Sequence, residues 1–376
     1  MADATPTPLP DTRPALRTAA KTGATWDLFC RVIDNYGDIG VCLRLARDLV
    51  GRGEQVRLWC DDLGPLAWMQ PTPVERLACL PWPGSEHAEP GDVVIETFGC
   101  ELPAPFVAAM AARAVKPAWI NLEYLSAESY VERSHGLKSP QFSGPGAGLD
   151  KWFFYPGFTA RTGGLLREPL LVDASDRHDA PRWLAERGWA PAGGERVLSL
   201  FAYPHAPLAG FLDALGAGWL LLLCPGAPQT ELPPLLRAGQ RAIALPPLTQ
   251  ADYDRLLWSC DLNLVRGEDS FVRAQWAGRP MLWQIYFQHD GAHGPKLEAF
   301  LDRQLAGAPP AQAAGWRALS RAWNGLAPWD EASAGALRAL PEATALARAW
   351  RDELSAQPDL ATQLQAFASR AIGLSS

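Results

Sequence analysis

Two short turns in the sequence gather side chains that could carry out chemistry on a charged substrate. The first turn contains Arg266, Glu268, Asp269 and Ser270. It lies between an apolar run at 261–265, typical of a strand, and a helical pattern at 270–277 that a glycine and a proline would end. Backbone N–H groups at the start of a helix lack partners within the helix and attract anions. With an arginine beside them, they indicate a site for the diphosphate of a nucleotide.

The second turn, with the sequence DNYGDIG at 34–40, follows a predicted strand at 26–33 and precedes a predicted helix at 39–50. Open α/β sheets place their sites in the loops at the carboxyl ends of their strands. Asp34 and Asp38 could therefore face one cleft, where a carboxylate can act as a general base. The glycine spacing does not match the G-x-G-x-x-G fingerprint of dinucleotide-binding proteins.

Helix capping is the alternative explanation for both turns. Asp269 or Ser270 could be the N-cap of the second helix, and Asp38 could cap the first while Asp34 forms an Asx turn. Capping needs neither an arginine nor a glutamate in the same turn, and it does not need two aspartates. We therefore expect that at least part of each turn binds or reacts.

Strand-like and helical segments alternate along the chain, which is typical of α/β domains with parallel sheets. The predicted strands lie at 26–33, 55–60, 91–97 and 117–122 in the first half, and at 196–201, 219–224, 241–244, 261–265 and 280–286 in the second. We expect a disordered leader at 1–25, a Rossmann-like domain at 26–180 and a second one at 190–350. The last helix, at about 355–376, is expected to pack back onto the first domain.

Composition and charge exclude several classes of protein. A net charge of −7 and a pI near 5.5 argue against broad nucleic-acid binding, which depends on neutralising many phosphates. The seven cysteines form no CxxC pair, so we expect neither a zinc site nor a disulfide framework, and a reducing cytoplasm fits best. No apolar run is long enough to span a membrane. His289 and His293 are four apart but lie beside glycines without a third ligand, so no metal is expected.

Four separated segments together resemble a known family. They are DNYGDIG from Asp34, NLEYLSAE from Asn121, FFYPGF from Phe153 and RGEDSFVRAQWAG from Arg266. In this order they resemble the EarP family, protein-arginine rhamnosyltransferases that modify elongation factor P (EF-P), from about Trp26 to the C-terminal helices. The resemblance implies a GT-B glycosyltransferase fold, in which two Rossmann-like domains face a central cleft and the acceptor-binding domain comes first. It also implies TDP-β-L-rhamnose as donor, an arginine of EF-P as acceptor, inversion at the anomeric carbon and no cofactor.

The resemblance also carries the family's functional residues onto this sequence. The essential carboxylates fall on Asp34, Asp38 and Glu268. The contacts with the nucleotide sugar fall on Phe201, Tyr203, Gln250, Arg266, Gly267, Asp269 and Ser270. Pro247 stands where the family usually has a phenylalanine that stacks on the thymine, and a proline ring offers less stacking surface than an aromatic face.

These assignments suggest how a glycosyl transfer could run. Arg266, with the helix start beside it, would stabilise the negative charge that grows on the leaving diphosphate without a metal ion. A guanidinium stays protonated at neutral pH, so Asp34 and Asp38 would hold it by charge-assisted hydrogen bonds and accept its proton, with Asp38 as the favoured base. Glu268 would position the sugar or hold the acceptor across the cleft. The loops at 123–141 are the expected docking surface for EF-P.

Two other functions stay open on the sequence alone. A GT-B enzyme with a different nucleotide sugar or acceptor is favoured by Pro247, and donor competition would distinguish it. A non-catalytic nucleotide-binding protein would use Asp34 and Asp38 only as caps and the Arg266 turn only to bind a phosphate. An Asp38→Asn variant that binds the donor but loses transfer would exclude this second alternative.

Overall fold

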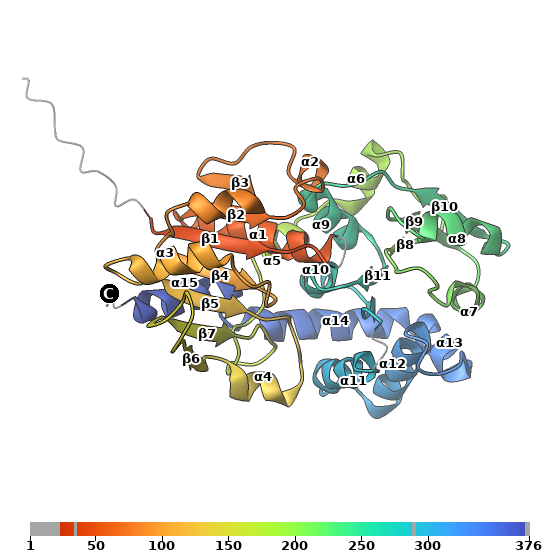
Figure 1. Ribbon diagram of the computed structural model, residues 1–376. Helices are drawn as coiled ribbons and strands as arrows, with labels where there is room; N and C mark the ends of the chain where they lie inside the picture. Colours follow the sequence, from red (N-terminus) through yellow and green to blue (C-terminus); the bar gives the residue numbers. More distant parts are fainter. Residues whose placement is uncertain (1–22, 34–35, 288–290, 373–376) are drawn as a thin grey trace, which may run out of the picture.

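The strands of the protein form two separate sheets in a computed structural model that describes residues 23–33, 36–287 and 291–372. The first sheet has the order β3-β2-β1-β4-β5-β7-β6, and only β6 runs antiparallel to its neighbour. Its strands are β1 Thr25–Cys30, β2 Gln55–Cys60, β3 Leu77–Pro81, β4 Val93–Thr97, β5 Ala118–Leu122, β6 Lys138–Pro140 and β7 Asp150–Phe154. The first sheet with the helices that pack on it is called the first lobe below (Figure 1).

The second sheet has the order β10-β9-β8-β11-β12 and is parallel throughout. Its strands are β8 Arg196–Leu200, β9 Trp219–Leu223, β10 Gln240–Ala244, β11 Leu262–Arg266 and β12 Met281–Gln284. Parallel sheets covered on both faces need strands without an exposed side. All five residues of β9 (WLLLL) in this sheet and of β4 (VVIET) in the first are buried accordingly. This second sheet and its helices form the second lobe.

Each sheet contains the Rossmann strand order, which places its ligand crevice. In the first lobe, successive strands are added outward from β1 through β2 to β3, and the chain then returns to the other side of β1 with β4. The second lobe repeats this course, with β8 in the place of β1 and β11 in the place of β4. At such a switch point the connections leave a crevice outside the carboxyl ends of the strands. The two catalytic candidates of the sequence, the turns after β1 and β11, both lie at a switch point.

Helices cover the faces of both sheets. In the first half of the chain they are α1 Gly37–Gly51, α2 Leu66–Met69, the 3-10 helix η1 Trp82–His87, α3 Ala104–Ala112, α4 Ser129–Ser134, α5 Leu171–Asp176 and α6 Ala180–Glu186. In the second half they are α7 Leu208–Leu215, α8 Pro228–Glu231, η2 Pro233–Leu235, α9 Gln250–Ser259, α10 Asp269–Ala277, α11 His293–Gln304, α12 Pro310–Trp323, α13 Glu331–Arg338, α14 Leu340–Ser355 and α15 Leu360–Ala371.

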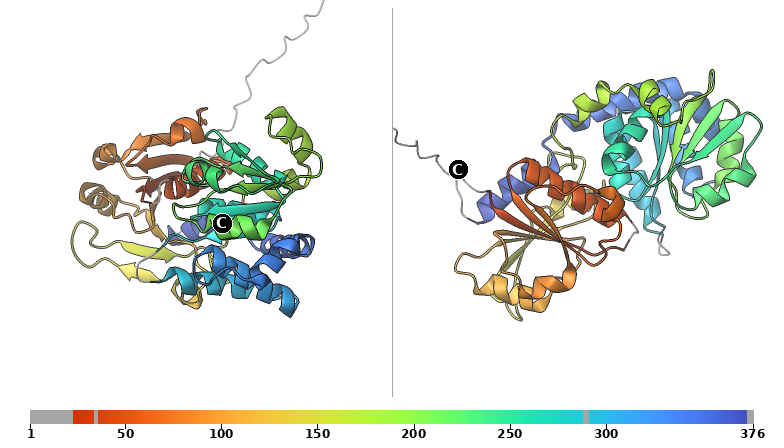
Figure 2. Two further views of the ribbon diagram at one scale, coloured as in Figure 1. Left: turned by 90° about the vertical axis from the view of Figure 1, so that its right-hand side faces the viewer. Right: turned by 90° about the horizontal axis from the view of Figure 1, so that it is seen from above.

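The C-terminal helices contact both lobes. Trp316, Trp323 and Trp350 are buried in the core that contains the second sheet. Helix α14 then runs back toward the first lobe, and α15 lies against it (Figures 1 and 2). Leu360 and Leu364 of α15 are buried in the core formed by α1 and the first sheet. The C-terminal helices therefore form a second connection between the lobes, in addition to the segment that joins β7 to β8.

The strand ends differ from the sequence-based expectations in ways that have physical reasons. The first strand starts at Thr25 and stops at Cys30, three residues before the predicted end, because it follows the length of its neighbour β2. Strand β3 and helix α2 were not predicted; both are short, and β3 is only half-buried at the sheet edge, so neither has a clear periodicity. None of the helices in the described ranges combines the length and apolarity that a membrane crossing requires.

Candidate active site

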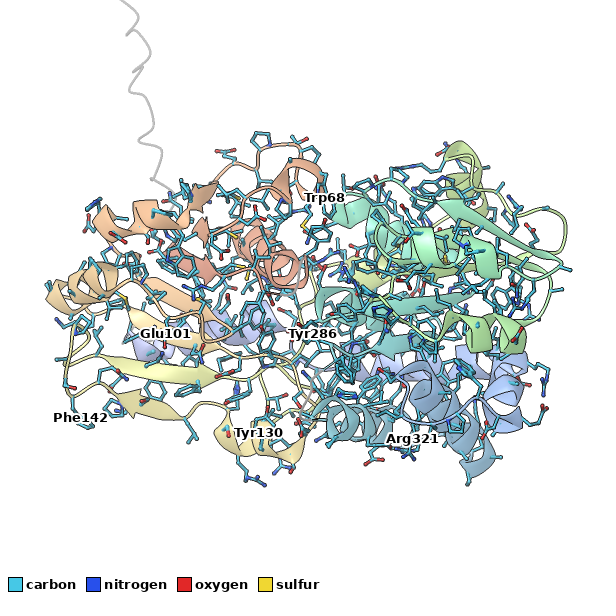
Figure 3. All side chains as sticks on the ribbon, turned by 45° about the vertical axis from the view of Figure 1, so that its right-hand side comes forward. Trp68, Glu101, Tyr130, Phe142, Tyr286 and Arg321 are labelled. Atoms are coloured by element: carbon cyan, nitrogen blue, oxygen red, sulfur yellow. The ribbon has the colours of Figure 1, made fainter. Side chains whose placement is uncertain are left out.

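A cavity of about 840 Å³, part of it open to solvent, lies where the two lobes meet. The second lobe contributes most of the residues assigned to the nucleotide sugar, namely Phe201, Gln250, Arg266, Gly267, Asp269 and Ser270, together with Pro247 and Tyr253. The first lobe contributes Tyr36, Gly37, Arg44, Trp68 and Met69. Figure 3 shows Trp68 and Tyr286 at the boundary between the lobes. Most of the residues assigned to the donor from the sequence therefore line one cavity that both lobes build.

The turn after β11 presents Arg266 to this cavity. Its guanidinium lies over the ring of Phe201, 4.2 Å from the centroid, and over the ring of Tyr203 at 4.6 Å. Two aromatic faces hold a planar cation in one orientation while its N–H donors stay available. Gly267 has a φ of 62°, which lets the chain turn sharply into α10. The structure thus places the predicted cation at the start of a helix, where an anion would bind.

Neither Asp269 nor Ser270 caps α10, so the capping alternative is wrong for this turn. The N-cap is Glu268, which makes no side-chain cap bond. The Ser270 hydroxyl instead donates to the carbonyl of Arg266 and accepts the N–H of the same residue, at 3.2 Å for the second bond. The side chain of Asp269 is held by Arg44 of the first lobe, with 2.7 Å between Oδ1 and Nε.

Gln250 begins α9, and it too contacts the first lobe. Thr249 caps this helix by accepting the N–H of Asp252 at 3.1 Å. The side-chain amide of Gln250 donates to the carbonyl of Gly40 at 2.9 Å. Its Oε1 is buried on the cavity wall and has no hydrogen-bond partner among the residues that the structure describes. A donor group on a ligand in the cavity could satisfy this oxygen.

Asp38 lies in the first turn of α1, directly after the carboxyl end of β1. It is not the N-cap, which is Tyr36, so the capping alternative is wrong for Asp38 as well. Its carboxylate accepts the N–H of Ile33 at 2.8 Å and the hydroxyl of Tyr124 at 3.4 Å. The residue is 3% exposed. Asp34, the other predicted carboxylate of this turn, lies outside the described residues.

Tyr124 and Phe98 form an aromatic wall beside Asp38. The two rings are stacked with centroids 4.2 Å apart and planes inclined by 8°. They come from the loops after the neighbouring strands β4 and β5, at the same edge of the sheet as Asp38. A flat aromatic surface next to a buried carboxylate suits a planar cation such as guanidinium.

Glu268 belongs to the second lobe but contacts the first. Its Oε2 accepts the N–H of Leu125 at 2.9 Å, and the side chain lines a second, smaller cavity of about 380 Å³. Burial raises the pKa of Glu268 to about 7. The charges of Lys296 and the Leu125 N–H lower this pKa, whereas the carboxylates of Asp38 and Asp269 raise it further. The negative charges of Asp38 and Glu268 therefore repel each other across the interface between the lobes.

Two other acidic residues of the same sheet edge have different surroundings. Glu96 is buried and forms an ion pair with Lys151 at 2.9 Å and a hydrogen bond with the indole of Trp119, so it serves the structure of the sheet. Glu123 accepts the amide of Asn121 at 2.6 Å, and burial raises its pKa. It lines the smaller cavity with Glu268.

Sequence reasoning missed the part of the cavity wall that the first lobe supplies. Trp68 and Met69 lie on α2, a four-residue helix with no recognisable pattern. Arg44 lies on α1 among residues that are all buried, and a charged residue within an apolar helix face was the available signal. Among the described residues, no group of three histidine, cysteine, aspartate or glutamate side chains is arranged to hold a metal ion.

Two Rossmann-like lobes with a cavity between them form the fold of a GT-B glycosyltransferase. Solved structures agree with this fold. The spinosyn forosaminyltransferase SpnP matches with a TM-score of 0.52 at 14% identity, covering 92% of this chain and 98% of that one. A structure described as "Structural basis for EarP-mediated arginine glycosylation of translation elongation factor EF-P" matches with a TM-score of 0.66 at 36% identity, covering 92% of this chain and 99% of that one.

Sequence comparison identifies the family. Residues 26–369 match the family of Elongation-Factor P (EF-P) rhamnosyltransferase EarP. The protein-arginine rhamnosyltransferase of Pseudomonas putida is 46% identical over 92% of this chain and 98% of its own length, and that of Pseudomonas aeruginosa is 44% identical over the same shares. The protein of that name from Neisseria meningitidis is 37% identical over 79% of this chain and 83% of its own length. The chain belongs to the EarP family, which confirms the resemblance seen in the sequence motifs.

Proposed function

We propose that the chain transfers L-rhamnose from TDP-β-L-rhamnose to an arginine side chain of EF-P, with inversion at the anomeric carbon. The family assigns the activity: the chain is a protein-arginine rhamnosyltransferase, and EF-P is its acceptor. The donor, the stereochemistry and the residue roles are the part that we propose. The observation that supports them most strongly is that one short loop of the first lobe contacts a carboxylate of each lobe. The hydroxyl of Tyr124 bonds to Asp38, and the N–H of Leu125 bonds to Glu268, whose chain neighbours Gly267 and Asp269 line the cavity that contains Arg266.

Arg266 and the start of α10 are proposed to hold the diphosphate of the donor. Negative charge grows on the diphosphate as the glycosidic bond breaks, and a preorganised cation with a helix N-terminus stabilises that charge. The stack of Arg266 on Phe201 and Tyr203 fixes the cation before the donor arrives. The base of the nucleotide would then lie toward Pro247 and Gln250 on the same cavity wall.

The acceptor chemistry is proposed to depend on carboxylates from both lobes. A guanidinium is a poor nucleophile while all its nitrogens carry protons, so a carboxylate must orient it and take one proton as the new bond forms. Asp38 is the proposed base, with Asp34 as its partner in holding the cation. Glu268 supplies negative charge from the other side. A guanidinium entering this space would favour the ionised form of Glu268, because opposite charges lower the pKa of a carboxylate.

The lobes divide these tasks in the proposal. The first lobe, residues 26–180, binds the acceptor, and the second, residues 190–350, binds the nucleotide sugar, with the C-terminal helix packed on the first. The segment 123–141 remains the proposed docking surface for EF-P, although it contains α4 and β6 and not only loops as expected from the sequence. It leads directly from β5 to the wall beside Asp38. EF-P acts in translation, and we propose the cytoplasm as the place of reaction.

Product stereochemistry and donor competition test this proposal. EF-P is incubated with the enzyme and TDP-β-L-rhamnose, and the anomeric configuration of the sugar on arginine is determined by NMR spectroscopy. Direct displacement predicts an α-linked product, and a β-linked product would refute inversion. In parallel, TDP-rhamnose, TDP-glucose and UDP-sugars compete for the free enzyme in a calorimetric binding assay. Tighter binding of a UDP-sugar would refute the assigned donor and favour a different nucleotide sugar, which is the alternative that Pro247 suggests.

A further inference from the structure

A buried ionic cluster joins the two lobes beside the cavity. Arg44 of α1 binds Asp269 of α10, with 2.7 Å between Nε and Oδ1, and also binds both oxygens of Asp254 of α9 at 3.0 and 3.1 Å. From the other side, Arg273 binds both oxygens of Asp254 at 2.9 and 2.8 Å and Glu168 at 2.5 Å. Arg44 and Arg273 are each 2% exposed. Asp254 is therefore held between two planar cations in a region closed to water.

The cluster fixes the backbone of α1 against the first turn of α10. Gly40, one turn before Arg44, accepts the side-chain amide of Gln250 at 2.9 Å. A Cβ atom on Gly40 would lie 3.0 Å from Oδ2 of Asp269, so the two helices touch at this point with no room for a larger residue. Arg44 and Gly40 thus form one contact face of α1, and that face meets the turn that carries Glu268, Asp269 and Ser270.

The contact between α1 and α10 lies between the proposed base and the proposed diphosphate site. Asp38, the proposed base, is in the first turn of α1, and the proposed diphosphate site is the first turn of α10. The distance between base and leaving group is therefore set by how these two helix starts are held. Small errors in such a distance are costly in enzymes, since displacement of a reacting group by about 1 Å can slow a reaction about 100-fold.

Arg44 also compensates the negative charge of Asp269 at the proposed donor site. Asp269 lines the cavity directly beside Arg266 and Ser270. A free carboxylate there would repel the diphosphate that the turn is proposed to bind. Burial raises the pKa of Asp269, and the charges of Arg44 and Arg273 work against that rise. With Arg44 bound to it, Asp269 presents a neutral pair to the cavity instead of a negative charge.

We propose that Arg44 is a positioning residue for the transfer reaction. It holds the start of α10 against the start of α1, so that the donor diphosphate and Asp38 meet at reacting distance, and it neutralises Asp269 so that the diphosphate can bind. This inference rests on the proposed function, because it takes Asp38 as the base and the α10 turn as the anion site. It assigns to the acceptor lobe a direct influence on donor binding.

Two substitutions of Arg44 separate the two effects. Arg44→Met removes the charge and keeps the length of the side chain; we expect kcat to fall about 10- to 100-fold and the dissociation constant of TDP-rhamnose to rise about 10-fold. Arg44→Lys keeps the charge but loses the planar fork; we expect donor affinity near that of the wild type, with kcat still reduced about 10-fold. Affinity for EF-P should stay unchanged in both variants. Arg47→Met, one turn further along α1 and half-buried, is the matched control and should keep kcat and donor affinity.

A double-mutant cycle with Asp269→Asn tests the electrostatic part. If Arg44 acts by neutralising Asp269, then Arg44→Met should weaken donor binding less in the Asp269→Asn background than in the wild type. Equal weakening in both backgrounds would overturn this part of the proposal. All assays are run well below the melting temperature of each variant, which is measured separately.

The remaining outcomes decide whether Arg44 positions the reacting groups or only stabilises the fold. If Arg44→Met lowers the melting temperature but keeps wild-type kcat and donor affinity, Arg44 is only a structural contact and the proposal is overturned. If Arg44→Met does not fold, Arg44→Lys decides alone, and an unchanged kcat in that variant overturns the positioning role. A wild-type enzyme that transfers no rhamnose would refute the proposed function instead, and the calorimetric comparison of donor binding would still test the role of Arg44.

Discussion

The backbone N–H of Leu125 donates a hydrogen bond to Glu268 across the interface between the lobes, at 2.9 Å. Leu125 follows β5 and lies one residue after Tyr124, whose hydroxyl bonds to Asp38. The same short loop therefore contacts the carboxylate of each lobe. The proposed capture of an arginine side chain requires such carboxylates, because they form charge-assisted hydrogen bonds with a guanidinium.

Asp38→Asn should separate chemistry from binding. Asparagine can still accept the N–H of Ile33, so we expect the melting temperature and the donor affinity to stay close to those of the wild type. It cannot take a proton from the acceptor, so transfer should fall by about 10²- to 10⁴-fold. Single-turnover rates and calorimetric titration with TDP-rhamnose measure the two properties. Normal transfer by this variant would show that Asp38 is not the base.

Arg266→Ala should weaken donor binding selectively. The substitution removes a cation from the proposed diphosphate site, and the loss of a charged hydrogen bond of about 1.5–3 kcal/mol corresponds to about 10- to 100-fold in affinity. Binding of EF-P, which is assigned to the other lobe, should be unaffected. An equal loss of donor and EF-P binding would indicate a folding defect, and the near-UV circular dichroism of the variant checks for one.

The activity of the wild type should rise with pH through about 7. Glu268, whose pKa is raised to about 7, is half protonated near neutrality, and only its ionised form attracts the acceptor cation. In Glu268→Gln this step should disappear from the pH profile of kcat/KM, leaving a lower activity that depends less on pH in that range. A step of the same size and midpoint in the variant would assign the titration to another group.

The same substitution should change stability in a defined pH window. The folded state keeps a proton on Glu268 that the unfolded chain, with an ordinary pKa of 4.5, has already lost, so the wild type loses stability as pH rises from about 4.5 to 7. Glu268→Gln should therefore be more stable than the wild type at pH 8, by about 1–2 kcal/mol once screening by solvent is considered. Near pH 4 the difference should vanish. Chemical denaturation at both pH values measures it, and a gain confined to low pH would contradict the assignment.

Pro247→Phe should strengthen donor binding. Pro247 is exposed on the cavity wall, where the base of the nucleotide is proposed to lie. An aromatic ring at this position would add a stacking contact worth about 1 kcal/mol, which is about fivefold in affinity. Calorimetry with TDP alone measures this gain without interference from the sugar. Unchanged affinity for TDP would show that the base lies elsewhere in the cavity.

Local patterns predicted the elements that carry the second-lobe site. The apolar run before Arg266 and the helix that ends at Gly278 are both signalled by neighbouring residues, and the structure contains them within a residue or two. Parallel sheets in both halves followed from the alternation of buried strands and helices. The family motifs supplied the assignments that periodicity could not, including the pairing of two separate turns in one site.

What the sequence could not indicate depends on contacts between distant residues. Arg44 and Asp254 are 210 positions apart, and nothing local shows that their side chains meet. The first-lobe contacts of Gln250 and Asp269 could not be predicted for the same reason, since they form only when α1 packs against α9 and α10. Trp68 and Met69 reach the cavity on a helix too short to show a period.

The central claim is that this chain glycosylates an arginine of EF-P with a nucleotide-activated rhamnose. Intact-mass spectrometry of EF-P from the same organism, after incubation with the enzyme and TDP-rhamnose without added metal, tests it most directly. We expect a gain of one deoxyhexose, located on an arginine by fragmentation, and no gain with the Asp38→Asn variant as control. An unmodified EF-P in the presence of an enzyme that binds the donor would contradict the account and direct the search to another acceptor.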